Sequence, residues 1–106
     1  MKVFLIRERS GIKATAEYDP STKNITVFKG SILSTRIAHT EKFRGAKSIE
    51  KSREGVTKDN VLQKDITFKS ASTAANFVTG SSTNGLTAWK DSNGKTLKQL
   101  IAEAEA

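Results

Sequence analysis

An unbroken alternation of apolar and polar residues in the first quarter of the chain constrains the fold most. In a strand, successive side chains point to opposite faces, so this pattern predicts a half-buried strand. Its apolar residues share one face and are Ile12, Ala14, Ala16 and Tyr18. The turn-forming residues 19–24 follow, and residues 25–28 are apolar and β-branched again. We predict an antiparallel hairpin with a loop of about four to six residues.

Other segments extend this hairpin into a sheet. A lone hairpin is marginal in water, so residues 3–7 are predicted to add a third strand. Leu62, Ile66 and Phe68 lie at even spacing and predict a fourth strand. Residues 86–90 are predicted to form a further short strand, and the turn-forming residues 91–94 follow it.

Two segments have strong helix signals and a third has a weaker one. Ser70 is a predicted N-cap and Gly80 the stop of a helix with an alanine-rich inner face. Thr96 and Gln99 match a capping box, which predicts a final helix. Its inward residues are Leu97, Leu100 and Ile101. A thinner apolar stripe predicts a weakly held helix at about 46–54, with Gly55 at its end.

The length of 106 residues is that of one domain. We expect an α+β fold with an antiparallel sheet of four to five strands and two to three helices. Within it, residues 1–33 hold N-terminal strands, 34–60 a basic, weakly ordered segment, and 61–106 a strand, a helix, a hairpin and a helix. Cysteine is absent, so the fold must rest on packing.

Positive charge is unevenly distributed. The formal net charge is +7, and residues 1–69 hold 15 Lys and Arg against 8 Asp and Glu, whereas residues 70–106 hold 3 of each kind. This balance favours a polyanionic partner, although a simple contribution to solubility remains open. We predict phosphate contacts from Lys29, Lys42, Arg44, Lys47, Lys51 and Lys69, with a solvated lysine as the alternative for Lys29 and for Lys69 taken singly. Lys29 and Lys69 each close a predicted strand and are expected at the same end of the sheet.

The segment 79–90 is dense in glycine and hydroxyl groups and holds the only tryptophan. Ser81, Ser82 and Asn84 are predicted to bind phosphate oxygens or base edges, and the alternative is a turn whose side chains bond their own backbone. Trp89 beside Lys90 is either a core anchor with a lysine that reaches solvent or an exposed ring for stacking on a base.

The same region carries a family resemblance. Residues 74–80, Ser82-x-Asn84-Gly85, Trp89-Lys90 and 94–97 resemble an uncharacterised domain family that often lies C-terminal to GIY-YIG-type endonuclease domains and in restriction-modification proteins. The pattern is also similar to the RAMA domain, restriction enzyme adenine methylase associated, for which a DNA-recognition role has been proposed.

The resemblance is strongest over residues 68–101 and has two departures. Family members usually carry Arg where this chain has Ser81, and an aromatic residue where it has Leu86. The resemblance implies a DNA-related accessory role for the chain, and these two positions weaken the implied contacts.

Residues suited to catalysis are scarce. His39 is the only histidine and is interpreted as an ordinary surface residue, and no acidic residue is followed two positions later by lysine, as a common nuclease signature requires. Gly94-Lys95-Thr96 matches the end of a phosphate-binding P-loop, but Trp89 stands where that loop needs glycine. We therefore expect no enzyme activity, no metal and no cofactor.

These observations predict a non-catalytic DNA-binding or DNA-sensing accessory module of a prokaryotic defence or DNA-processing system. DNA is favoured over RNA, and a nuclease or methylase is a possible protein partner. The alternative is a protein-interaction module that docks on a nuclease, a methylase or its own copy through the Trp89 region. The apolar run 3–6 is too short for a signal peptide or a membrane span, so we expect a cytoplasmic protein without a membrane partner.

Overall fold

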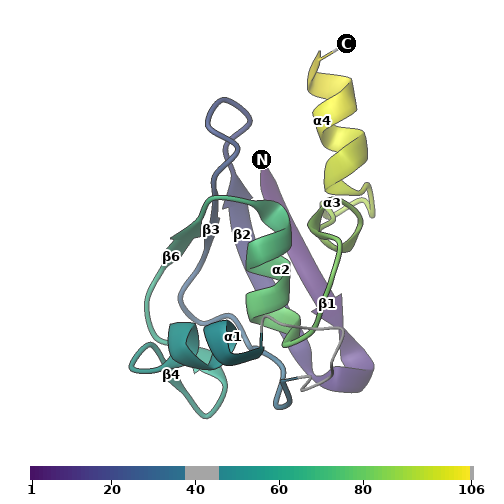
Figure 1. Ribbon diagram of the computed structural model, residues 1–106. Coiled ribbons are helices and arrows are strands. Elements are labelled where there is room, and N and C mark those ends of the chain that lie inside the picture. Colours follow the sequence, from purple (N-terminus) through teal and green to yellow (C-terminus); the bar gives the residue numbers. More distant parts are fainter. Residues whose placement is uncertain (38–45, 106) are drawn as a thin grey trace.

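A four-stranded antiparallel sheet forms the centre of the computed structural model, which describes residues 1–37 and 46–105. Its spatial order is β1-β2-β3-β6. The strands are β1 (Lys2–Arg7), β2 (Ile12–Tyr18), β3 (Ile25–Val27) and β6 (Ile66–Phe68). Helices pack on one face of this sheet (Figure 1), so the predicted α+β class is confirmed.

The predicted hairpin is confirmed. β2 and β3 pair antiparallel with Tyr18 opposite Ile25, and residues 19–24 connect them. β1 adds to the other side of β2, with Val3 opposite Ala16. The alternating apolar side chains of β2 all point into the core, and Ala14 and Ala16 are fully buried. Small residues at these positions let the covering helix approach the sheet closely.

The predicted strand over residues 62–68 is interrupted. It divides into β5 (Val61–Leu62) and β6, which belong to different sheets, and β5 pairs with β4 (Thr57–Lys58). Between them the Asp65 carboxylate accepts a 2.7 Å hydrogen bond from the Lys29 amide. A side-chain acceptor therefore replaces the regular ladder at this point.

Two of the predicted helices are present in the structure. α2 (Ala71–Thr79) begins at Ser70, whose hydroxyl accepts from the Thr73 amide at 3.1 Å, and it ends at Gly80 with a φ of 72°. α1 (Ala46–Arg53) buries Ala46, Ile49 and Arg53. Both helices lie where the sequence predicts them.

The C-terminal region differs from the prediction in one element. Residues 86–90 do not form a strand, because α3 (Gly85–Ala88) occupies most of this segment. Its N-cap is Asn84, whose side-chain oxygen accepts from the Leu86 amide at 3.0 Å. After it, the chain turns and α4 (Leu97–Glu105) begins at the predicted capping box, with Thr96 and Gln99 bonded reciprocally.

Trp89 links these helices to the core. Its ring is fully buried, and its indole nitrogen donates a 3.0 Å hydrogen bond to the Ala71 carbonyl. The amide of Leu97 in turn donates to the Trp89 carbonyl at 2.8 Å. The segment around Trp89 makes few strand hydrogen bonds, and these two bonds hold it against α2 on one side and α4 on the other.

Candidate functional site

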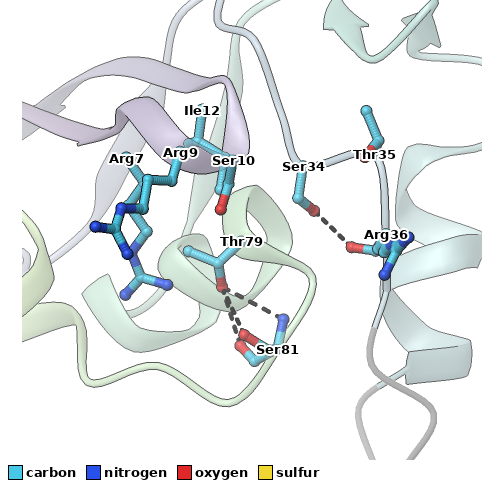
Figure 2. Close-up of a pocket in the computed structure, with 9 residues that line it drawn as sticks. All are labelled: Arg7, Arg9, Ser10, Ile12, Ser34, Thr35, Arg36, Thr79 and Ser81. Carbon is cyan, nitrogen blue, oxygen red and sulfur yellow. Dashed lines mark hydrogen bonds between the residues drawn. The ribbon is translucent and has the colours of Figure 1, made fainter.

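Three arginines from two separate parts of the chain line one hollow of about 400 Å³ at the end of the sheet where β1 turns into β2 (Figure 2). We call it the arginine hollow. Arg7 and Arg9 lie on one side of it and Arg36 on the other, with Thr79 and Ser81 between them. The remaining lining residues are Ser10, Ile12, Ser34 and Thr35. No Asp or Glu is among these described lining residues, so positive charge dominates the hollow.

The first two arginines follow from the turn between β1 and β2. Arg7 ends β1, and Arg9 lies in the 3-10 helix η1 (Glu8–Ser10). Gly11 closes η1 in the left-handed region at a φ of 69°, and its amide bonds the Glu8 carbonyl at 3.1 Å. This tight turn leaves both arginine side chains exposed at the same end of the sheet.

The third arginine depends on a glycine. The Ser34 amide donates to the Val78 carbonyl at 2.9 Å, and the Ser34 hydroxyl donates to the Arg36 carbonyl at 2.7 Å. A Cβ at Gly80 would lie 2.2 Å from the Arg36 carbonyl oxygen. Gly80 therefore has two roles, because it ends α2 in a left-handed conformation and lets the Arg36 segment cross the end of that helix.

A fourth arginine, Arg53, is buried and does not line the arginine hollow. Arg53 donates to the Ser34 carbonyl at 2.9 Å and to the Phe77 carbonyl at 2.7 Å. These acceptors are uncharged, and burial lowers the pKa of the Arg53 guanidinium from its ordinary value. The Phe77 carbonyl belongs to the last turn of α2, where the helix dipole favours a cation. Arg53 thus joins α1, α2 and the Ser34 segment.

Local hydrogen bonds order the hydroxyl groups of the hollow. The Thr79 hydroxyl donates to the Ser81 carbonyl at 3.1 Å and lies 2.8 Å from the Thr83 hydroxyl. The Thr83 amide donates to the Asn76 side-chain oxygen at 2.8 Å. These bonds fix the shape of the loop, while Ser82 and Asn84 keep exposed side chains.

The family comparison covers nearly the whole chain. Residues 4–101 match the family DUF4357, described as a domain of unknown function. The chain belongs to the DUF4357 family. No curated protein and no solved structure matches it. The comparisons therefore support an uncharacterised family, as predicted, and give no support to the finer resemblance to RAMA or to domains beside GIY-YIG nucleases.

Two further findings concern the described part of this DUF4357 domain. None of its helices is long and apolar enough to cross a membrane. Across residues 1–37 and 46–105, no group of three or more His, Asp or Glu side chains is arranged to hold a metal ion.

The structure separates the predicted basic contacts. Lys47 and Lys51 are four positions apart on the exposed face of α1. Glu50 on the same helix and Glu54 just after its end line a second hollow, together with Thr35 and other residues. Acidic side chains therefore stand beside the Arg36 segment, and the α1 lysines lie apart from the arginine hollow. Predicted residues outside the described ranges are Lys42, Arg44 and His39.

One predicted placement is corrected, and the core-anchor alternative for Trp89 is confirmed. Lys29 follows β3 and Lys69 follows β6, and these strands are antiparallel, with Ile25 opposite Phe68 and Val27 opposite Ile66. The two lysines consequently lie at opposite ends of the strand pair. Trp89 is fully buried, so its ring presents no face for stacking on a base.

Of the remaining predicted residues, one lines the hollow and the others lie outside its lining. Ser81 lines it, and Ser82 and Asn84 lie in the adjoining loop with exposed side chains. Lys90 is exposed too, while its amide and carbonyl bond Phe4 of β1 at 2.9 and 2.7 Å.

Arg7, Arg9 and Arg36 are absent from the predicted contacts. The first two stand in the sequence as the end of an apolar run, and Arg36 as one basic residue among many. Only the turn at Gly11 and the crossing at Gly80 bring them together.

Proposed function

We propose that this DUF4357 domain is a non-catalytic DNA-binding module that holds backbone phosphates in the arginine hollow. The observation that supports this proposal is the gathering of Arg7, Arg9 and Arg36 around one hollow whose described lining lacks carboxylates. Guanidinium groups present several N–H donors in a plane and bind phosphate oxygens in pairs. Three of them around one hollow concentrate positive charge that the same number of scattered surface lysines would spread out.

Hydroxyl and backbone groups complement this charge. Protein contacts to phosphates use Ser and Thr hydroxyls and backbone amides as well as arginine. Ser10, Thr35 and Ser81 are such residues in the lining. The exposed lysines Lys47 and Lys51 on α1 are proposed as peripheral contacts, because each added cation near the DNA releases further counterions.

The proposal includes a role beside other proteins. The resemblance described above motivates action in trans with a nuclease or methylase in a prokaryotic defence or DNA-processing system, and copurification from the native host tests that part. A protein-docking role is the second candidate. It is favoured by a small hollow over Phe4 and Ile6, since Ile6 is 52% exposed. Trp89 itself is buried and is no longer its basis.

Fluorescence anisotropy on a labelled duplex at several salt concentrations tests the DNA proposal. The triple variant Arg7→Ala, Arg9→Ala, Arg36→Ala should bind more weakly and should flatten the log-log salt slope by about one unit for each lost contact. A matched control is Lys58→Ala, Lys64→Ala, Lys98→Ala, which removes the same charge, from +7 to +4, outside the hollow.

The two triple variants separate a local site from general charge. Equal loss in both would contradict a site at the hollow. Absence of binding by the unaltered domain near 50 mM salt, where non-specific contacts are normally detectable, would overturn the DNA proposal and favour protein docking.

A further inference from the structure

Another hollow, different from the one that Glu50 and Glu54 line, adjoins the arginine hollow along the edge of β1. Its volume is about 460 Å³, and we call it the edge groove. Arg7 lines both hollows, and the loop that carries Ser81 into the first carries Ser82 into the second. The rest of its lining consists of Leu5, Ile6, Thr83, Asn84, Thr87, Ala88 and Lys90. A ligand held by Arg7 therefore has direct access to the edge groove.

The floor of the edge groove is an open strand edge. β1 pairs with β2 on one side, with Leu5 opposite Ala14. On the other side, the Phe4 backbone bonds Lys90. Backbone groups alternate in direction along an antiparallel strand, so Ile6 points its amide and carbonyl the same way as Phe4. Within residues 1–37 and 46–105, no backbone hydrogen bond to Ile6 occupies this edge.

The edge groove combines apolar and hydrogen-bonding groups. Ile6 is 52% exposed and offers an apolar surface in the groove. On the facing wall, the Asn84 side-chain oxygen is engaged as the α3 cap, and the same amide group still carries two N–H donors on an exposed residue. An apolar surface with a few placed donors and acceptors is typical of small-ligand sites.

We propose that the edge groove receives an unpaired base, so that the domain binds a single-stranded stretch of nucleic acid in preference to a duplex. This inference rests on the proposed function, because the phosphate of the same nucleotide is held by Arg7 in the arginine hollow. The base lies against Ile6, and its edge bonds the Ile6 backbone and the Asn84 amide. The bases of a duplex engage their Watson–Crick edges with each other, whereas splayed bases present them to protein.

The experiment compares a labelled single-stranded DNA oligonucleotide with the duplex of the same sequence by anisotropy at one fixed salt concentration. We expect the single strand to bind about tenfold more tightly, in keeping with the contribution of one well-held base. Asn84→Ser keeps a good N-cap for α3 and removes the amide donors. It should weaken single-strand binding about fivefold, the effect of one lost hydrogen bond, and thereby reduce the preference for the single strand over the duplex.

Ile6→Thr provides a second variant, because it retains a β-branched residue for the strand and removes apolar surface. Its control is Ile32→Thr, at an isoleucine that is also exposed, at 40%, and lies outside the edge groove. We expect Ile6→Thr alone to weaken single-strand binding, with thermal unfolding confirming that all variants fold.

Each outcome has a defined consequence. Single-strand preference reduced by Asn84→Ser and Ile6→Thr supports the inference. Equal or tighter duplex binding overturns it and leaves the phosphate site intact, provided that the arginine triple variant still loses binding. Single-strand preference that neither groove variant changes overturns the assignment to the edge groove. Absence of binding to both probes overturns the inference together with the proposed function.

Discussion

The guanidinium of Arg53 donates to the Phe77 carbonyl through two of its nitrogens, at 2.7 and 3.1 Å, and lies 5.7 Å from the centre of the Phe77 ring. One side chain of α1 thus binds the last turn of α2. Through the Ser34 carbonyl and hydroxyl it also holds the segment that leads to Arg36. The buried arginine links the stability of the fold to the geometry of the arginine hollow.

Replacing Arg53 should therefore be costly. Arg53→Met keeps an unbranched side chain and leaves the carbonyls of Phe77 and Ser34 without their donor, so we expect a loss of about 3 kcal/mol in the free energy of unfolding. Urea denaturation followed by circular dichroism measures it. Lys51→Met on the exposed face of the same helix is the control and should change stability by about 0.5 kcal/mol or less. Equal effects of the two substitutions would contradict a specific role for the buried guanidinium.

Gly85 is a second position at which we expect substitution to destabilise the fold. A Cβ there would lie 2.2 Å from the Ala71 carbonyl carbon, which is backbone and cannot rotate away. Gly85→Ala should force α3 from α2 and destabilise the domain by about 1–3 kcal/mol, although alanine is the better helix former. Leu86→Ala, at the next position, is the control. Thermal melts compare them, and a Gly85→Ala variant as stable as the parent would show that the contact is looser than described.

Most of the regular elements were predictable, because local signals and tertiary packing agree in them. The alternation in β2, the N-cap at Ser70 and the capping box at Thr96 each act over a few residues, and the structure has all three. The strand predicted over residues 86–90 was wrong because tertiary contacts override the local pattern there. The Asn84 cap and the close approach of Gly85 to the Ala71 backbone favour a turn of helix there.

The candidate site was much less predictable than the fold. Arg7 and Arg36 are 29 positions apart in the sequence, and they line one hollow because the chain turns at Gly11 and crosses the end of α2 at Gly80. In the sequence, nothing distinguishes Arg53 from the exposed basic residues near it. Its burial depends on carbonyl acceptors on another helix. Pairwise tertiary geometry of this kind leaves no periodic trace in one sequence.

The stability of the turn between β2 and β3 should depend on pH in the acid range, through the carboxylate of Asp19. The Asp19 carboxylate accepts from the Ser21 hydroxyl at 2.7 Å and from the Ser21 amide at 2.9 Å, and chiefly the hydroxyl bond lowers the pKa of Asp19 below its ordinary value. Because its pKa is lowered in the folded state, the ionised Asp19 carboxylate stabilises the fold at pH values above the ordinary pKa of aspartate. That stabilisation is lost as the pH falls through the folded-state pKa.

Ser21→Ala should raise the pKa of Asp19 toward its ordinary value and reduce the acid dependence of stability between about pH 5 and pH 2. Carboxyl chemical shifts followed by NMR through the titration measure the pKa directly. Thr22→Ala is a neighbouring control whose side chain makes a smaller contribution to the Asp19 pKa. An unchanged Asp19 titration in Ser21→Ala would contradict the assigned cause.

The last prediction separates the structural role of Trp89 from nucleic-acid contact. Trp89→Phe keeps an aromatic ring and removes the indole donor to the Ala71 carbonyl, so one buried hydrogen bond is lost. We expect the free energy of unfolding to fall by about 1–3 kcal/mol. Where the variant is folded, its affinity for a labelled oligonucleotide should match that of the parent, because the ring is fully buried and presents no stacking face. Anisotropy at a temperature well below both unfolding midpoints makes the comparison, with the arginine triple variant as the control for lost binding. A folded Trp89→Phe domain with weakened binding would place the indole at the nucleic-acid surface and require α3 to open on binding.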